Sequence, residues 1–313
     1  MWSYTDSRAA VRDALRLSRA MTLKAAVANL DLGGGKGVIM LPTDGPLSSA
    51  RRRAALLDFG DTVHALEGRY ITAEDVGTSS RDMSVIAERT THVGGLARSR
   101  GGSGDPSPLT ALGVEAAIHA SCERAFADRS LRGRTICVIG LGHVGSRVAK
   151  RCVRAGATVL AADLDQRKRG IAEQIGARWT SSAAALVSEV DVLVPCALGG
   201  ILDHESVPRL RCRVVAGAAN NQLADDRVAE LLQERGVLWA PDFVVNAGGV
   251  INIAEELGGY DPASARRRVS SIGDTLREIY AHADADRTTP LAAAMQLAAR
   301  RLARSNGRHP IGA

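Results

Sequence analysis

Aromatic residues are scarce in this 313-residue sequence, at 3% of the chain, and no apolar run approaches the length needed to cross a bilayer. The lack of aromatics leaves no stacking platform for single-stranded nucleic acid, and the 40 basic residues are interspersed with 34 acidic ones. We therefore interpret the net charge of +6 as a solvated surface that attracts anionic ligands mildly. Neither nucleic acid nor a membrane is an expected partner.

Cysteines are also few, and their spacing excludes the common metal sites. The five are Cys122, Cys137, Cys152, Cys196 and Cys212, and none of them forms a CxxC pair. We predict no metal centre and no disulfide framework. The first residues include acids and lack the apolar core of a secretion signal, which favours a cytoplasmic protein. With 45% hydrophobic and 24% charged residues, the chain is long enough for two globular domains.

Residues 134–163 carry the strongest functional signal. The β-branched run Thr135–Ile139 predicts a buried strand, and it leads directly into the turn GLGHVG. A helix over 146–154 and a second strand over 157–162 are expected next, and the second strand ends in an acid, Asp163. This order is typical of a dinucleotide-binding unit, although a purely structural βαβ turn is the alternative.

Each residue type in this unit suits the binding of NAD. Gly140 makes the tight turn, Gly142 allows the backbone to approach a pyrophosphate, and Gly145 allows close packing of helix on strand. The helix N-terminus offers free N–H groups to the phosphates. Asp163 can accept hydrogen bonds from the ribose and repels a 2′-phosphate, which favours NAD over NADP. The predicted cofactor site also includes Leu141, His143 and Val144. The basic residues Arg167, Lys168 and Arg169 weaken the preference for NAD.

Beyond Asp163, helices and strands continue to alternate, which predicts a doubly wound parallel sheet. Expected strands lie at 177–180, 191–195, 213–216 and 237–240, with helices at 166–175, 182–188, 205–209 and 224–235. Ligands bind beyond the carboxyl ends of such strands, so the loops 196–200, 217–222 and 240–249 are expected to face the cofactor. Cofactor-binding candidates in these loops are Cys196, Ala197, Asn221 and Asn246, and the asparagines are alternatively simple turn formers.

The N-terminal part has an unusual segment with three consecutive glycines before Lys36. Glycine loses more backbone entropy on folding than any other residue, so this run predicts a close backbone approach or unusual backbone dihedral angles. Lys24 and Lys36 flank an almost uncharged stretch, and burial in a cleft would lower a lysine pKa toward acid/base chemistry. Either lysine is alternatively a surface residue. Asp75 follows a short expected strand and is by itself equally consistent with a turn or a helix cap.

The connector RSRGGSGDPSP, residues 98–108, predicts a domain boundary and a hinge that closes over substrate. We expect an α/β protein in which residues 1–106, with 288–313 returning to them, form a smaller substrate domain. Residues 107–287 form the Rossmann-type domain. The other expected helices lie at 7–20, 47–68, 80–91, 110–126, 263–284 and 290–304, and a further strand lies at 38–41.

Seven segments together resemble the leucine, valine and phenylalanine dehydrogenases, which are related to glutamate dehydrogenase. They are MTLKAAVANLDLGGGKGVI, ITAEDVGT, SGDPSPLTALGV, GLGHVGSRVA, CALGG, AGAANNQL and APDFVVNAGGVIN. The resemblance implies an NAD-dependent homo-oligomeric enzyme that interconverts a small apolar L-amino acid with its 2-oxo acid and ammonia. Its last helix would pack on the N-terminal domain. Family members usually carry about fifty residues before the position matching Met1, so the chain is expected to start inside the family's substrate domain.

The resemblance also implies roles for single residues. Lys24 would grip the substrate carboxylate, Lys36 would activate water against the imine, and Asp75 would bind the amino group and move protons. Thr110 would touch the nicotinamide amide, and Asn221 would lie near substrate and nicotinamide ribose.

The same resemblance bears on the substrate. Ala73, Val250 and Ile253 would line the side-chain pocket, the latter two from one face of a helix. Phenylalanine-specific members tend to have glycine at the position of Ala73, so we predict leucine, valine or isoleucine as substrate. A phenylalanine-type dehydrogenase and a non-catalytic NAD-binding remnant are the alternatives.

Overall fold

The computed structural model describes residues 1–42, 45, 47–197 and 199–305. The chain forms two compact units. The N-terminal unit comprises Met1–Pro106, Val250–Ala265 and the chain from Arg301, whereas the sheet unit comprises Ser107–Gly249 and Arg266–Arg300. The expected domains, 1–106 with 288–313 and 107–287, divide the C-terminal part of the chain differently and stay a prediction. No helix within the described ranges is long and apolar enough to cross a membrane.

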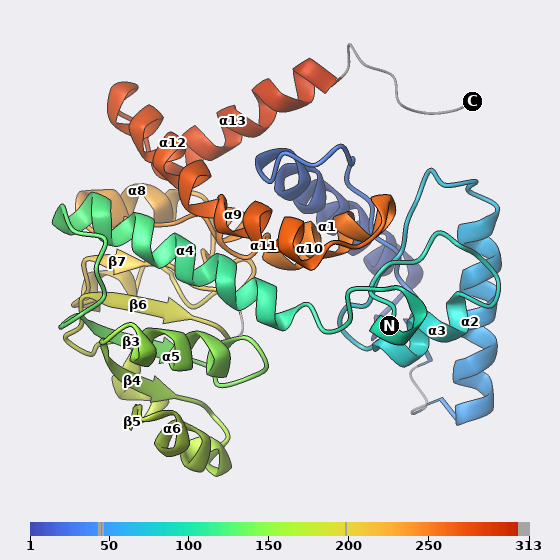
Figure 1. The fold of residues 1–313 in the computed structure, drawn as a ribbon, viewed down its shortest axis with the longest axis horizontal. Helices are drawn as coiled ribbons and strands as arrows, with labels where there is room; N and C mark the ends of the chain where they lie inside the picture. The colour runs from blue at the N-terminus through green and yellow to red at the C-terminus, as the bar shows by residue number, and fades with distance from the viewer. Residues whose placement is uncertain (43–44, 46, 198, 306–313) are drawn as a thin grey trace. The chain divides into compact units, whose positions relative to one another are not determined.

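The sheet unit is built on six parallel strands (Figure 1). They are β3 (Thr135–Ile139), β4 (Thr158–Ala162), β5 (Arg178–Trp179), β6 (Val192–Pro195), β7 (Val214–Val215) and β8 (Leu238–Trp239). Their order is β5-β4-β3-β6-β7-β8, so the chain starts in the middle and builds outward to both edges. Ile139 lies in register with Ala162 and Pro195, which brings the carboxyl ends of three strands to one edge. The expected doubly wound Rossmann-type sheet is confirmed.

Helices cover this sheet and complete its core. They are α4 (Ser107–Phe126), α5 (Gly145–Arg154), α6 (Arg169–Ile175), α7 (Ser182–Ala185), α8 (Arg227–Glu234), α9 (Asp242–Val245) and α12 (Ile272–Ala285). Short 3-10 turns lie at η2 (Gln166–Lys168) and η3 (Val207–Arg209). Cys137 and Cys152 are fully buried, as expected of small core residues. Helix α12 packs on α4, where the buried hydroxyls of Tyr280 and Ser121 lie 2.7 Å apart.

The expected helix 263–284 is instead two helices, α11 (Pro262–Ser270) and α12. Ser271 lies between them, and its hydroxyl donates to the carbonyl oxygen of Arg268 at 2.7 Å. A serine side chain that bonds to a nearby carbonyl competes with the regular helical pattern. The single helix was predicted from a long stretch with arginine on one face, and that pattern does not mark the break at Ser271.

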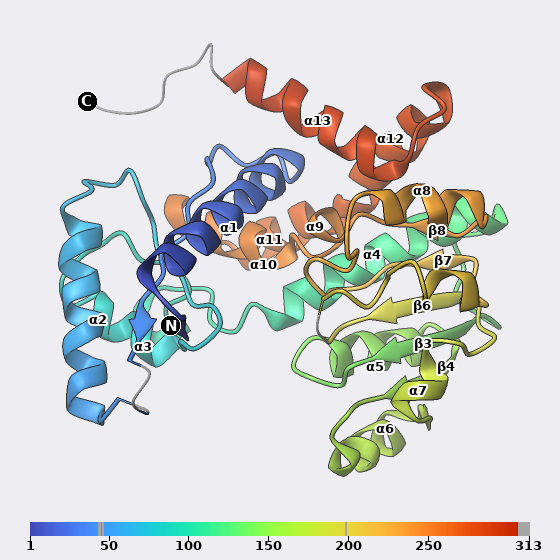
Figure 2. The same cartoon turned by 180° about the vertical axis from the view of Figure 1, so that it is seen from behind.

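The N-terminal unit is mostly helical, with one small sheet (Figure 2). Its elements are β1 (Trp2–Ser3), α1 (Ser7–Val27), β2 (Met40–Leu41), α2 (Ser49–His64), α3 (Ser80–Ile86), the 3-10 turns η1 (Arg98–Arg100) and η4 (Glu255–Gly258), and most of α10 (Gly248–Ala254). Strands β1 and β2 pair in parallel. A small core buries Leu56, Met83, Ile86 and Val93.

Two expectations for this unit were wrong in their extent. Helix α1 continues past residue 20 to Val27, because Met, Leu, Lys and Ala in MTLKAAV are all good helix formers. Lys24 therefore lies in the last turn of a helix and not in the glycine-rich segment. The strand expected before Asp75 is reduced to one bridge between Thr72 and Val93.

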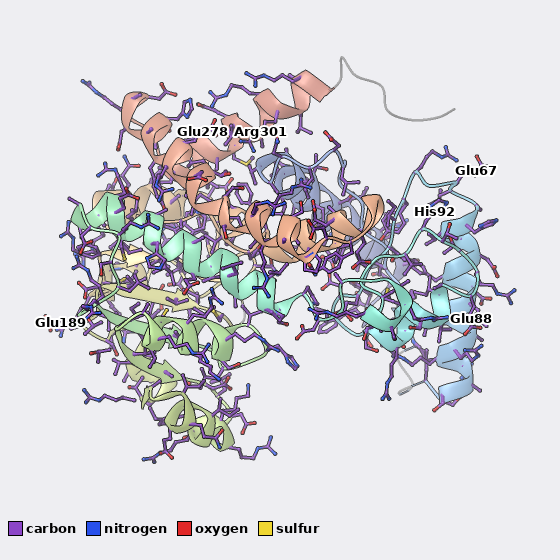
Figure 3. All side chains as sticks on the ribbon, viewed as in Figure 1. Glu67, Glu88, His92, Glu189, Glu278 and Arg301 are labelled. Atoms are coloured by element: carbon purple, nitrogen blue, oxygen red, sulfur yellow. The ribbon has the colours of Figure 1, made fainter. Side chains whose placement is uncertain are left out.

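The last helix, α13 (Pro290–Ser305), makes contacts at both of its ends. Leu291 packs against the core of the sheet unit. Arg301, labelled in Figure 3, donates to the carbonyl oxygens of Ala26 at 3.3 Å and Val27 at 2.6 Å. The last carbonyls of a helix have no partner within that helix, so Arg301 satisfies the end of α1.

Candidate active site

The glycine-rich loop after β3 gives each of its glycines a separate steric task. Gly140 has a φ of +100°, and a side chain there would lie 2.8 Å from the backbone nitrogen of Ala197. A side chain on Gly145 would collide with the carbonyl oxygen of Gly140, so α5 packs directly on the turn. A methyl group on Gly142, in contrast, would meet no atom within 4 Å among the described residues. The loop is thus tight at its two ends and open in the middle, where a pyrophosphate would approach.

Asp163 lies directly after β4 and joins this loop. Its carboxylate accepts hydrogen bonds from the N–H groups of Leu141 at 2.7 Å and Asp165 at 2.9 Å, and from the ammonium of Lys168 at 2.8 Å. Burial opposes its charge, but these donors outweigh burial and lower the pKa of Asp163. Lys168 was expected to weaken the preference for NAD over NADP. In the structure it forms an ion pair with Asp163, the acid that was expected to give that preference.

Asn246 is the most unusual polar residue near the carboxyl ends of the strands. Its side-chain nitrogen donates to the carbonyl oxygen of Ala218 at 3.2 Å and to Oδ1 of Asn220 at 2.8 Å. Its own Oδ1 is buried and has no hydrogen-bond partner within the described part of the chain. A buried acceptor that lacks a donor is costly, and the amide and hydroxyl donors of NAD are suitable partners. These residues therefore fit the predicted cofactor.

The other cofactor candidates occupy different environments. Asn221 is exposed and left-handed, with φ of +50°. Burial raises the pKa of the Cys196 thiol to about 11, so this cysteine is neutral and packs at the end of β6. Thr110 lies in the first turns of α4, where Gly248 approaches its Cα so closely that a side chain on Gly248 would be 3.0 Å away. Their contacts with cofactor stay a prediction.

Two of the three glycines before Lys36 lie too close to neighbouring residues to carry a side chain, whereas a side chain on Gly33 would meet no described atom within 4 Å. A side chain on Gly34 would lie 2.5 Å from the carbonyl oxygen of Ser18 and would collide with Thr22 on α1. The hydroxyl of Ser18 also donates to the carbonyl oxygen of Gly34 at 2.9 Å. One residue further, a side chain on Gly35 would lie 2.7 Å from the ring of Tyr70. The predicted close approach of the backbone is confirmed, and it fixes the segment that carries Lys36.

Lys36 and Asp75 form an ion pair, which unites the two predicted catalytic residues. Burial lowers the pKa of Lys36, as expected, while the charge of Asp13 raises it. The loop fixes Asp75 as well, since its backbone N–H donates to the hydroxyl of Thr78 at 2.9 Å and its Oδ1 accepts from Val76 N–H at 2.7 Å. A half-buried lysine beside a fixed carboxylate is suited to proton transfer.

Sequence reasoning missed Asp13 as a neighbour of this pair. Its spacing from Lys24 is eleven residues, close to three full helical turns, so the two lie on one face of α1. That regularity was the available signal, but it could be recognised only if the helix was known to continue to Val27.

The three candidates for the substrate side chain are partly buried. Val250 and Ile253 lie on α10, as predicted, while Ile251 and Asn252 between them are buried. Ile253 approaches Gly94 so closely that a side chain on Gly94 would lie 2.5 Å from its Cγ2. The role of Ala73 as part of the same pocket stays a prediction.

A six-stranded sheet of this order, with its glycine loop and terminal acid, defines a dinucleotide-binding protein. Comparison with known families agrees. Residues 114–198 match the NAD-binding domain of D-isomer-specific 2-hydroxyacid dehydrogenases. Residues 1–92 match the Glu/Leu/Phe/Val dehydrogenase dimerisation domain, and residues 161–309 match the glutamate/leucine/phenylalanine/valine dehydrogenase family.

Individual relatives give the same result. The chain is 41% identical to a leucine dehydrogenase of Thermoactinomyces intermedius, over 96% of this chain and 82% of the relative. It is also 41% identical to a valine dehydrogenase of Streptomyces coelicolor, over 98% and 84%. Among solved structures, L-tryptophan dehydrogenase from Nostoc punctiforme has a TM-score of 0.84 and 36% identity, over 97% of this chain and 86% of that one. The protein belongs to the Glu/Leu/Phe/Val dehydrogenase family.

Proposed function

We propose that this protein catalyses the reversible, NAD-dependent oxidative deamination of a branched aliphatic L-amino acid to its 2-oxo acid and ammonia. The observation that carries the proposal is the ion pair of a half-buried Lys36 with Asp75, in a chain 41% identical to leucine and valine dehydrogenases. A surface salt bridge would have little effect on the pKa of the lysine. Burial instead disfavours the ammonium form and makes the neutral amine accessible.

The reaction assigns a separate task to each residue of the site. Lys24 binds the substrate carboxylate. Asp75 leaves its ion pair with Lys36 and binds the substrate amino group instead. Asp75 takes a proton from the substrate ammonium, and loss of hydride from Cα leaves an iminium group. Neutral Lys36 then accepts a proton from water as the water oxygen adds to the iminium carbon. Asp75 returns its proton to the amino group, and ammonia leaves as the hydroxyl proton passes to Asp75 and the carbonyl forms. NAD, when bound, supplies the acceptor for the hydride from Cα. NAD would be held by residues of the sheet unit: the glycine loop with Leu141, His143 and Val144, then Asp163, Asn246 and Thr110, and the loop of Cys196 and Ala197. Asn221 would lie beside the reacting groups.

The proposed side-chain pocket favours aliphatic substrates. Ala73 contributes a methyl group, and Val250 and Ile253 are β-branched, so they are stiff and bulky near the backbone. Such walls suit leucine, valine or isoleucine and crowd a ring. One methylene changes specificity by about 1–3 kcal/mol, so the preference among aliphatic substrates is modest. The similarity to L-tryptophan dehydrogenase favours an aromatic substrate as the second candidate.

Assembly and location are further parts of the proposal. A related glutamate dehydrogenase of Thermus thermophilus, 25% identical, is hetero-hexameric, and the match over residues 1–92 is to a dimerisation domain. These relatives support an oligomer for this chain, and a homo-oligomer is our proposal. A cytoplasmic location is proposed from the sequence alone.

A spectrophotometric assay of NADH formation tests the function. The protein is incubated with NAD and a panel of L-amino acids that includes leucine, valine, isoleucine, phenylalanine, tryptophan and glutamate. We expect the highest kcat/KM for the branched aliphatic group and none for glutamate. A higher kcat/KM for phenylalanine or tryptophan would select the aromatic candidate. NAD binding without turnover of any amino acid would leave the non-catalytic alternative.

A further inference from the structure

The carboxylate of Glu256 joins two points of the chain that lie far from it in sequence. Glu256 belongs to η4, and its Oε1 accepts from the backbone N–H of Ser103 at 2.8 Å. Its Oε2 accepts from the N–H of Gly95 at 3.0 Å, and Oε1 shares that donor at 3.2 Å. All of these residues belong to the N-terminal unit. One side chain therefore binds the backbone at both ends of the loop 95–103.

The loop 95–103 brings these two donors together by folding back on itself. The N–H of Gly104 donates to the carbonyl oxygen of Leu96 at 3.0 Å, which closes the base of the loop. Gly95 and Ser103 are buried, and Ser103 is only 1% exposed. Water cannot replace the acceptor at such sites, so loss of the Glu256 carboxylate would leave buried N–H groups unpaired. The charge of the acceptor strengthens both bonds.

Glu256 also lies on the same side of its helix as a residue of the proposed side-chain pocket. Ile253 precedes it by three residues, and α10 continues into η4 with helical dihedral angles at Ala254. Residues three apart share one face of a helix. Ile253 packs against Gly94, where a side chain on the glycine would lie 2.5 Å from its Cγ2. The pocket residue and the carboxylate thus contact adjacent residues, Gly94 and Gly95, of one segment.

The same segment is tied to the loop that carries Ala73. The N–H of Gly94 donates to the carbonyl oxygen of Thr72 at 2.7 Å, and the N–H of Thr72 donates to the carbonyl oxygen of His92 at 3.0 Å. These bonds form an isolated parallel bridge. Ala73 follows Thr72 directly in the sequence. Gly94 thus links the helix of Ile253 to the loop of Ala73.

We propose that Glu256 is a positioning residue for substrate selection, because it holds Ile253 of α10 at a fixed place relative to Ala73. The inference deepens the proposed function and rests on it. Glu256 binds the backbone of Gly95 and Ser103, and it acts on the substrate only through the walls of the pocket. If the carboxylate only stabilised the unit, its removal would lower activity on all substrates equally. A positioning role instead changes the relative activity on substrates of different side-chain size.

The substitution Glu256→Gln tests this role with little change in size. It removes the charge and replaces one acceptor oxygen by an amide donor, which cannot bind a backbone N–H. We expect the ratio of kcat/KM for L-leucine to that for L-phenylalanine to fall about five- to tenfold, mainly through a higher KM for leucine. The KM for NAD should stay the same. Glu256→Asp keeps the carboxylate on a shorter side chain, so its ratio should lie between those of the wild type and Glu256→Gln.

Glu88→Gln is the matched control within the N-terminal unit. Glu88, labelled in Figure 3, forms an exposed ion pair with Arg53. The variant makes the same chemical change, and its substrate ratio should equal that of the wild type. A double variant of Glu256→Gln with Ile253→Val tests the path of the effect. If Glu256 acts through Ile253, the effect of the double variant on the ratio differs from the product of the two single effects. Single effects that simply multiply would contradict a role through Ile253.

Amide hydrogen exchange measures the same contact without turnover. The peptide covering 93–104 should exchange faster in Glu256→Gln and at the wild-type rate in Glu88→Gln, because Gly95 and Ser103 lose their acceptor only in the former. An unchanged substrate ratio in a folded Glu256→Gln protein would overturn the inference, whatever its exchange rate. A wild-type protein that turns over no amino acid would contradict the proposed function. Faster exchange in Glu256→Gln would then still support Glu256 as the residue that holds the loop.

Discussion

The sheet unit and the N-terminal unit differ in how their functional residues are positioned. In the sheet unit, the glycine loop follows β3 and Asp163 follows β4. These two strands pair in parallel, so their pairing brings the loop and Asp163 together. In the N-terminal unit, Lys36 and Asp75 meet through loops that regular strands do not support. There, packing of glycine backbone on α1 fixes the site in the way that strand pairing fixes it in the sheet unit. The proposed catalytic residues thus lie in the less regular of the two units.

Replacement of Lys36 should have the largest effect and should separate the two units functionally. Lys36→Ala removes the proposed base, so we expect kcat to fall by roughly three orders of magnitude, within the range that general acid–base groups contribute. NAD binding, measured by fluorescence titration, should stay near normal because the dinucleotide loop lies in the other unit. Lys24→Ala should mainly raise KM through the lost carboxylate contact. Normal turnover in Lys36→Ala would remove the catalytic assignment.

Glycine substitutions compare the packing of the two units directly. Gly34→Ala forces a methyl group into the backbone of α1, and Gly145→Ala forces one into the carbonyl of Gly140. Each should destabilise the protein by about 2–3 kcal/mol or more through overpacking. Gly33→Ala and Gly142→Ala, where no described atom lies within 4 Å, are the matched controls.

Thermal unfolding of these four variants gives the comparison. Gly34→Ala should also lower kcat, because the displaced segment carries Lys36, whereas Gly145→Ala should mainly weaken NAD binding. Equal stability of Gly33→Ala and Gly34→Ala would show that the close approach to α1 is not needed.

The contrast between the units also explains what the sequence could predict. The parallel strands, the loop and Asp163 were predicted because apolar strands and glycine spacing are local signals. The length of α1 was underestimated, and with it the place of Lys24 was missed. The environment of Lys36 depends on the charge of Asp13 and the ion pair with Asp75, which come from other segments, and one sequence contains no local sign of that meeting. The division of α11 from α12 at Ser271 has no local mark in the sequence over 263–284.

Asp163 should have a smaller effect, limited to the cofactor. Asp163→Asn keeps an acceptor but removes the charge that opposes a 2′-phosphate and releases Lys168 from its ion pair. The loss of one charged hydrogen bond corresponds to about 1.5–3 kcal/mol, so the ratio of kcat/KM for NAD to that for NADP should fall at least tenfold. Asp165→Asn, which breaks the exposed pair with Arg167, is the control and should leave the ratio unchanged. A ratio that stays high in Asp163→Asn would mean that another residue selects NAD.

The smallest expected effect concerns the substrate side chain. Ala73→Gly removes one methyl group from the proposed pocket while Val250 and Ile253 remain. Since about one methylene is at stake, kcat/KM for L-phenylalanine should rise roughly fivefold relative to L-leucine. The extra flexibility of glycine lowers the stability of the folded protein, which affects activity on both substrates alike. The ratio of the two kcat/KM values within one variant therefore reports on the pocket alone. Ala73 lies in the same loop as Asp75. This variant therefore tests whether one irregular loop carries both a proposed catalytic residue and a residue that determines substrate preference. An unchanged ratio would move the pocket away from Ala73 and leave Val250 and Ile253 as its candidates.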